Sequence, residues 1–292
     1  MRLFDLHADT PSKLFYQSKE FNDPSLHLSA ADLPYWESCT QVLAFFCRPG
    51  LTDDEAYRDF FTMRADTLAK TAPYEARLTP ILAVEDARLL GNSIERLAVL
   101  AKCGVRILTL LWRGETTIGG AFDTNTGLTA FGKYILKDCF RLGIHPDLSH
   151  ASEPAFWEAA TIAEERQLPI LATHSNARAL CAHPRNLYDE QFLAIRSSGG
   201  LVGLCLCPEH LTSGGTASRR DAIRHLEHWL AIGGEDTVAL GTDFDGIEST
   251  PTDITKNREL IALAEELLRL GYREEIVKAL FYKNAQGFFK KL

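Results

Sequence analysis

The sequence lacks the marks of secreted, membrane-spanning and nucleic-acid-binding proteins. No uninterrupted apolar run is long enough to cross a bilayer. A strand-like segment begins at residue 2, where a secretion signal would place a charged region and an apolar stretch. The 39 acidic residues outnumber the 31 basic ones, so no basic field attracts phosphates or anionic lipids. We therefore expect a cytoplasmic protein without nucleic-acid or membrane partners.

Other absences exclude particular enzyme classes. No Gly-x-Ser-x-Gly elbow is present, which disfavours a serine hydrolase. The turn expected at residues 7–12 has no glycine, whereas a doubly wound nucleotide-binding sheet normally carries a glycine-rich turn after its first strand. The seven cysteines are an odd set that lies mostly in apolar segments, which indicates reduced thiols. The spacing of Cys205 and Cys207 fits neither common metal nor redox motifs and favours buried strand thiols.

Short apolar segments alternate with stretches of helical periodicity along the whole chain. The helical stretches carry start signals such as Thr52-x-x-Glu55 and Asn92-x-x-Glu95. The apolar segments span 2–9, 41–47, 79–85, 105–112, 144–150, 169–174, 200–207 and 238–243. Such a series is what a closed parallel barrel requires. We predict one (β/α)₈ TIM-type barrel domain over residues 1–292, of the metal-dependent hydrolase type; an open doubly wound sheet is the alternative.

Six side chains able to bind metals stand where five of these expected strands end. Barrel enzymes build their sites at this end of the strands, so the six should meet at one mouth. A lone histidine in an apolar strand is more often a hydrogen-bonded core residue, but six coincidences favour a metal site. The residues are His7, Asp9, Glu85, His150, His174 and Asp243.

The ligand types and spacing predict a pair of divalent ions. His7 and Asp9 are two residues apart on a strand, so their side chains share a face and can chelate one ion. Glu85 can bridge two ions with its two oxygens, and His150 and His174 would complete the second site. Such ions, about 3.5–4 Å apart, share a hydroxide and polarise a carbonyl. Imidazole and carboxylate ligands suit zinc, and also iron or manganese.

Several motifs together resemble the renal (membrane) dipeptidase family of zinc peptidases, in particular its bacterial members. The resemblance runs through almost the whole chain, and the order of the motifs makes it specific. The motifs are Asp5-Leu6-His7-Ala8-Asp9, Gly127-Leu128-Thr129-Ala130-Phe131-Gly132, Asp147-Leu148-Ser149-His150, Thr173-His174-Ser175-Asn176-Ala177-Arg178, His183-Pro184-Arg185-Asn186 and Gly241-Thr242-Asp243-Phe244-Asp245-Gly246.

The resemblance implies a barrel with two Zn²⁺ ions that hydrolyses dipeptides with a free C-terminal carboxylate, and it suggests a homodimer. It assigns His7 and Asp9 to one zinc, His150 and His174 to the other, and Glu85 to both. Arg185 falls at the family's carboxylate-binding arginine, and a guanidinium pairs bidentately with a carboxylate. Asp243 falls at the acidic residue that handles the proton.

The chain departs from the family pattern in two places. Asp86-Ala87 follows Glu85 where the family often has two glycines, so the backbone there is bulkier. Trp112 stands where the mammalian members have a histidine that is thought to hold the substrate or stabilise the oxyanion. Tryptophan carries no charge and accepts no proton, so it can only donate one hydrogen bond or wall the pocket. Side-chain preference is therefore open at this position.

Two other functions compete with the dipeptidase assignment. One is another metallohydrolase on the same barrel that acts on N-acyl amino acids, cyclic amides or phosphate esters, because fold analogy alone does not exclude it. Arg185 discriminates, since a carboxylate clamp is idle for a neutral ester. The other is a binding protein that has lost turnover, which the intact ligand set disfavours.

Overall fold

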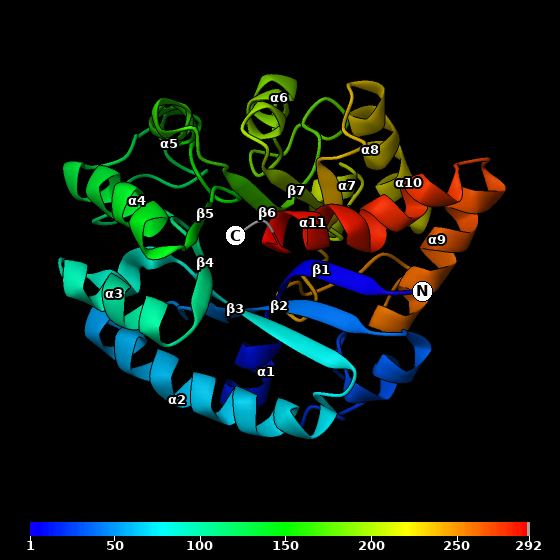
Figure 1. Ribbon diagram of the computed structural model, residues 1–292, viewed down its shortest axis with the longest axis horizontal. Coiled ribbons are helices and arrows are strands. Elements are labelled where there is room, and N and C mark those ends of the chain that lie inside the picture. Colours follow the sequence, from blue (N-terminus) through cyan, green and yellow to red (C-terminus); the bar gives the residue numbers. More distant parts are fainter. Residues whose placement is uncertain (291–292) are drawn as a thin grey trace.

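The computed structural model describes residues 1–290 as a closed parallel barrel with helices around it (Figure 1). All neighbouring strands pair in chain order, and β8 pairs with β1 to close the ring. The eight strands are β1 Leu3–Ala8, β2 Cys39–Phe46, β3 Leu78–Glu85, β4 Val105–Thr109, β5 His145–Asp147, β6 Leu171–Ser175, β7 Leu201–Leu204 and β8 Val238–Leu240. This confirms the predicted (β/α)₈ fold.

Four predicted strand ends lay too far along the chain. One is that of β7, which ends at Leu204 and not at residue 207. Trp112, His150 and Asp243 were also expected to close their strands, but β4, β5 and β8 end before them. The reason is visible at β5, where Asp147 Oδ1 accepts hydrogen bonds from Ser149 N and Ser149 Oγ and so turns the chain out of the ladder. The three residues therefore reach the mouth from loops.

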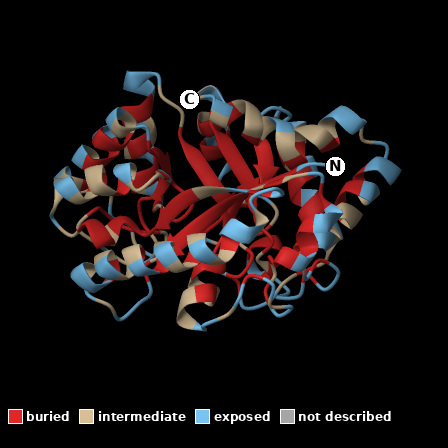
Figure 2. Ribbon diagram, turned by 60° about the horizontal axis from the view of Figure 1, so that its bottom comes forward, coloured by how far each residue is buried: buried red, intermediate tan, exposed pale blue. Residues whose placement is uncertain are grey.

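The outer layer consists of helices with exposed outer faces and buried inner faces (Figure 2). Thr52 and Glu55 form the expected capping box of α2, whereas α3 begins after Ser93 and not at Asn92. The α-helices are α1 Thr10–Tyr16, α2 Asp53–Thr71, α3 Ile94–Lys102, α4 Ala130–Leu142, α5 Glu153–Arg166, α6 Asp189–Ser197, α7 Pro208–Leu211, α8 Arg219–Ala231, α9 Leu260–Arg269, α10 Glu274–Lys278 and α11 Asn284–Lys290.

Short helices fill several connections. They are η1 Ala30–Tyr35, η2 Ala72–Tyr74, η3 Ala87–Leu90, η4 Asn257–Glu259 and the π-helical turn η5 Ala279–Lys283. Within residues 1–290, no helix combines the length and the apolar character that a transmembrane segment needs.

The end of the barrel where the strands begin is closed by α11. Ala285 and Phe288 of this helix pack against apolar residues of seven strands, and Figure 1 shows the helix lying across the barrel. The strand residues are Phe4, Leu6, Val42, Ala83, Ile107, Leu171, Leu201 and Ala239. With this end sealed by apolar packing, the opposite mouth is left for a site.

Candidate metal centre and substrate cavity

Three imidazoles converge on the carboxylate of Glu85 at the mouth. His150 Nε2 and His174 Nε2 lie 3.0 and 3.5 Å from Glu85 Oε1. His7 Nε2 lies 3.7 Å from the other oxygen, Oε2, and 3.3 Å from Asp9 Oδ2. The two oxygens of Glu85 therefore face two different groups of ligands, in the division that the sequence predicted.

The polar atoms of this group satisfy one another poorly, and bound cations would satisfy them better. His150 Nε2 and His174 Nε2 are 2.9 Å apart, and His7 Nε2 and Asp9 Oδ1 are buried with no hydrogen-bond partner. A buried polar atom without a partner is costly, and lone pairs that face one another repel. Imidazole and carboxylate donors in this arrangement fit divalent ions.

The outer nitrogens of the three imidazoles are held by oxygens of the protein. His150 Nδ1 lies 3.0 Å from the carbonyl oxygen of Trp112, and a carbonyl only accepts, so this nitrogen carries the hydrogen. The Nδ1 atoms of His7 and His174 lie 3.2 and 2.9 Å from one hydroxyl, Thr173 Oγ1. A neutral ring whose hydrogen is at Nδ1 presents a bare Nε2 to the centre, as a metal ligand must.

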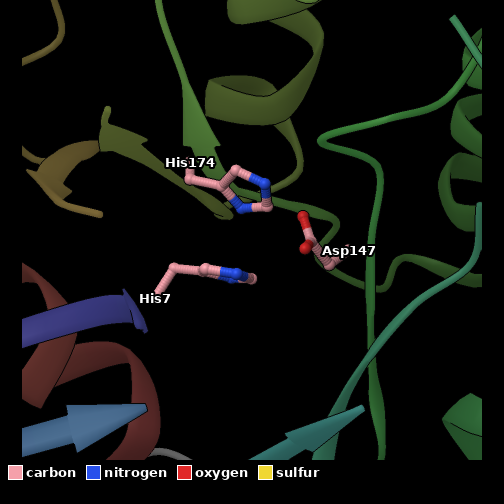
Figure 3. A group of neighbouring side chains, drawn as sticks. All are labelled: His7, Asp147 and His174. Carbon is pink, nitrogen blue, oxygen red and sulfur yellow. The ribbon is translucent and has the colours of Figure 1, made fainter. Parts of the chain in front are cut away.

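Asp147 lies close to His7 and His174 (Figure 3), and the three side chains satisfy the distances of a metal site. However, its two oxygens already accept five hydrogen bonds, from Thr109, Ser149 and Thr173. One of them, from Thr173 Oγ1 at 2.6 Å, leaves that hydroxyl free to accept from both imidazoles. Asp147 therefore orients the hydroxyl of Thr173, which in turn accepts from His7 Nδ1 and His174 Nδ1.

Burial and mutual repulsion shift the acids at the centre. Burial raises the pKa of Glu85 to about 8, and the negative charge of Asp9 adds to the effect. Burial also raises the pKa of Asp243 to about 7, against the opposing charge of His7. Burial lowers the pKa of His150 and His174 well below the usual value, which keeps both rings neutral. A cluster of acids that resist ionisation in the absence of cations is suited to bind them.

Asp243 is placed by a strained turn after β8. Its φ of 62° is in the left-handed region, and Asp245, two residues on, has a φ of 66°. Gly246 follows, and a side chain there would collide with the carboxylates of both Asp9 and Asp243. The turn thus brings Asp243 beside Asp9. Strain of this kind collects at functional sites.

A cavity of about 720 Å³ opens above the centre, and six predicted site residues line it. These are Asp9, Glu85, Trp112, His150, Arg185 and Asp243. His7 and His174 lie beneath, only 1% exposed. The structure therefore brings all eight predicted residues to one mouth.

Arg185 is a buried cation with unused hydrogen-bonding capacity. It is 4% exposed; Nη2 donates to the carbonyl of His174 at 3.4 Å, and Nη1 has no partner. Its guanidinium lies over the ring of Phe122, 5.7 Å from the centroid. A buried guanidinium that lines a cavity with a free Nη1 is equipped to receive a carboxylate.

Sequence reasoning missed several residues of the mouth. Thr173 and Asp147 received no role, although a threonine and an aspartate in buried strands signal an internal hydrogen-bond network. His183 and His210 seemed to have no companion in the sequence, yet both line the cavity with ring centroids 4.5 Å apart. Cys207 lines it too.

Two known proteins are similar in sequence to large parts of this chain. A protein from Klebsiella pneumoniae, described as an uncharacterised protein in the pqqA 5′ region, is 39% identical over 62% of this chain and 70% of its own length. Dipeptidase 3 from Rattus norvegicus is 27% identical over 74% of this chain and 45% of its own length, so the match spans less than half of the rat protein.

Two solved structures are similar over nearly the full length. A metallopeptidase from Rhodobacter sphaeroides, bound to a phosphinate mimic of the dipeptide L-Ala-D-Ala, has a TM-score of 0.90 at 25% identity, with 99% of each chain covered. A dipeptidase of family M19 has a TM-score of 0.91 at 26% identity, with 99% of this chain and 98% of that chain covered. The family model described as membrane dipeptidase (peptidase family M19) matches residues 1–292. This chain therefore belongs to the membrane dipeptidase family and is a metallodipeptidase.

Proposed function

We propose that this chain is a zinc-dependent dipeptidase with two ions, which cleaves dipeptides that carry a free C-terminal carboxylate. The observation that carries the proposal is the buried, unpartnered Nη1 of Arg185 in the same cavity as the ligand set. The phosphinate mimic of a dipeptide bound by the Rhodobacter relative supports the substrate class. Cytoplasmic location and a homodimer remain predictions.

The proposed ligands divide between the two oxygens of Glu85. His7 and Asp9 would hold one ion on the Oε2 side, and His150 and His174 the other on the Oε1 side. Ions bound there would supply Lewis-acid polarisation of the peptide carbonyl and activation of a water. The hydrogen bonds at the three Nδ1 atoms keep the imidazoles oriented for this role.

Arg185 and Asp243 would perform the remaining steps. Arg185 would pair with the terminal carboxylate and so fix the scissile bond one residue away from it. Asp243 would take a proton from the attacking water and return it to the leaving amine as the carbon–nitrogen bond breaks. Its raised pKa of about 7 suits a group that must both accept and donate a proton near neutrality.

The test compares free dipeptides with their C-terminal amides, using zinc-loaded protein and substrates of L-L and L-D configuration. We expect cleavage of a free dipeptide, at least about 100-fold slower cleavage of its amide, and loss of both with a chelator. Arg185→Met should remove most of the difference between acid and amide, because the paired charge is gone.

The outcomes separate the parts of the proposal. Equal cleavage of acid and amide would keep the hydrolase and remove the carboxylate clamp. Zinc-loaded protein that cleaves no dipeptide would overturn the proposed function.

A further inference from the structure

We infer that the mouth carries a subsite for an acidic side chain, built by Arg48 and Arg113, and that dipeptides with an acidic first residue are the preferred substrates. The inference rests on the proposed function and adds the substrate class. Neither arginine belongs to the ligand set or to the residues that handle the proton. Both line the cavity and both are exposed at its rim.

The guanidinium groups of the two arginines stack on aromatic rings that also line the cavity. The guanidinium of Arg48 lies over the ring of Tyr16, 4.6 Å from the centroid, and that of Arg113 lies over Trp112 at 5.1 Å. Phe46, at the end of β2 and two residues before Arg48, also lines the cavity, and its ring centroid is 4.8 Å from that of Trp112. Stacking on a ring limits the freedom of an arginine and keeps its donors available. These five side chains form what we call the arginine wall.

The wall contacts an acid through Tyr16, whose hydroxyl donates to Asp59 Oδ2 at 3.0 Å. Among residues 1–290, no carboxylate forms an ion pair with Arg48 or Arg113, nor with Lys13, which lines the cavity beside them. The exposed acids of the cavity, Glu209 and Glu248, belong to the segments that follow β7 and β8. The cations instead come from α1 and from the segments that follow β2 and β4. The rim is therefore cationic on one arc and anionic on the other.

The position of Arg185 decides which end of the substrate meets the wall. Arg185 comes from the segment after β6, and β6 lies opposite β2 in a closed ring of eight strands. A dipeptide with its C-terminal carboxylate on Arg185 and its peptide carbonyl above Glu85 extends its first residue towards the β2–β4 arc. A neutral first residue brings only its ammonium group towards three cations, whereas Glu or Asp adds a carboxylate that pairs with them.

The experiment measures kcat/KM for Glu-Ala, Gln-Ala, Ala-Glu and Ala-Gln with zinc-loaded protein at low and high salt. Glutamine matches glutamate in shape, so each ratio isolates the charge. We expect a Glu-Ala to Gln-Ala ratio of about ten at low salt, which falls as salt screens the exposed guanidinium groups. The Ala-Glu to Ala-Gln ratio should stay below about two, the level of an unpaired surface charge.

Variants assign the preference to the wall. The double variant Arg48→Gln, Arg113→Gln should bring the Glu-Ala to Gln-Ala ratio close to one. Arg166→Gln at the end of α5 is the matched control, since Arg166 is exposed and does not line the cavity, and it should keep the ratio of about ten. Thermal unfolding and zinc content show whether each variant is folded and loaded, and the salt dependence of the unaltered protein tests the inference without any substitution.

Each result has a distinct meaning. Equal cleavage of Glu-Ala and Gln-Ala, or an acid preference only at the second residue, overturns the inference and leaves the dipeptidase intact. A preference that survives the double variant also overturns the assignment to the wall. Zinc-loaded protein that cleaves none of the four overturns the proposed function and the inference with it.

Discussion

The two ends of the barrel follow opposite physical rules. Where the strands begin, Phe288 of α11 packs on the apolar residues of the strands and closes the barrel. Where they end, Asp243 and Asp245 adopt left-handed backbone conformations, and His7 Nε2 and Arg185 Nη1 are buried without hydrogen-bond partners. The first end is arranged for stability. The second accepts local instability, which a bound ion and a substrate carboxylate would relieve.

The largest effect on the contrast between the two ends of the barrel is expected from a substitution of Glu85. Glu85→Gln should reduce kcat/KM at least about 10³-fold and lower the content of bound metal, because this carboxylate alone faces both ligand groups. Without metal, the same variant should unfold at a higher temperature than the unaltered protein, because it removes a buried acid repelled by Asp9.

Metal analysis, kinetics and calorimetry of the metal-free protein check these outcomes. Glu265→Gln, at an exposed position of α9, is the matched control and should change none of the three. A Glu85→Gln variant that keeps its metal and its activity would contradict the view that the mouth is built around this carboxylate.

The closed end should give the opposite result. Phe288→Ala should lower the free energy of unfolding by about 3 kcal/mol, since it removes a buried aromatic side chain that is 7% exposed. The metal content and the kcat/KM of the folded protein should not change. Denaturant unfolding measures the loss, with Leu268→Ala on an exposed face as control, expected within about 0.5 kcal/mol. Loss of metal in Phe288→Ala would show that the two ends are coupled.

The closed end also predicts a pH dependence. His145 packs against the rings of Phe288 and Phe289, and burial, assisted by the charge of Arg106, lowers its pKa to about 4. Below the ordinary pKa of about 6.5, the unfolded chain therefore binds a proton that the folded protein refuses. Stability from this residue is present above that pKa and is lost as the pH falls towards 4.

The loss between pH 7 and pH 5 should be about 2 kcal/mol. Denaturant unfolding of the metal-free protein at both pH values measures it, and His145→Gln should remove this part of the pH dependence. If His145→Gln loses as much stability on acidification as the unaltered protein, His145 does not hold a depressed pKa.

The sequence contains enough information for the barrel and for the residue types at its mouth, because both depend on local pattern. Buried strands are apolar, and His7 and Glu85 interrupt that pattern where the strands end. The exit of the chain before His150 was not predictable, because it depends on a side chain, Asp147, that accepts a hydrogen bond from the backbone of Ser149.

Hydrogen bonds between residues of different strands also could not be predicted from the sequence. Thr173 was quoted only as part of a motif, since no local pattern tells that its hydroxyl meets a histidine 166 positions earlier in the chain. The carbonyl of Trp112 accepts from His150 Nδ1, and this role could not be predicted from the sequence for another reason. Any residue at that position supplies a carbonyl. Chemistry that resides in the backbone leaves no mark in the sequence.

The smallest expected effect concerns the hydroxyl of Thr173. It separates the orientation of the two imidazoles from their burial. Thr173→Val keeps the shape of the side chain but removes the acceptor of His7 Nδ1 and His174 Nδ1. The two rings belong to different ions of the proposed pair, so both affinities should fall, each by about tenfold, the lower end of the range for such supporting contacts. Thr173→Ser, which retains the hydroxyl, should restore them.

Thr109→Val is the matched control. The hydroxyl of Thr109 also donates to Asp147 Oδ2 at 2.6 Å, the distance found for Thr173, but the hydrogen bonds of the three imidazoles do not involve it. Competition with a chelator gives the two affinities, and nitrogen NMR of the histidines in metal-free protein reports which ring nitrogen carries the hydrogen. Equal losses in the two valine variants would assign the effect to Asp147. A loss confined to Thr173→Val, with altered histidine tautomers, would mean that one hydroxyl prepares both halves of the mouth.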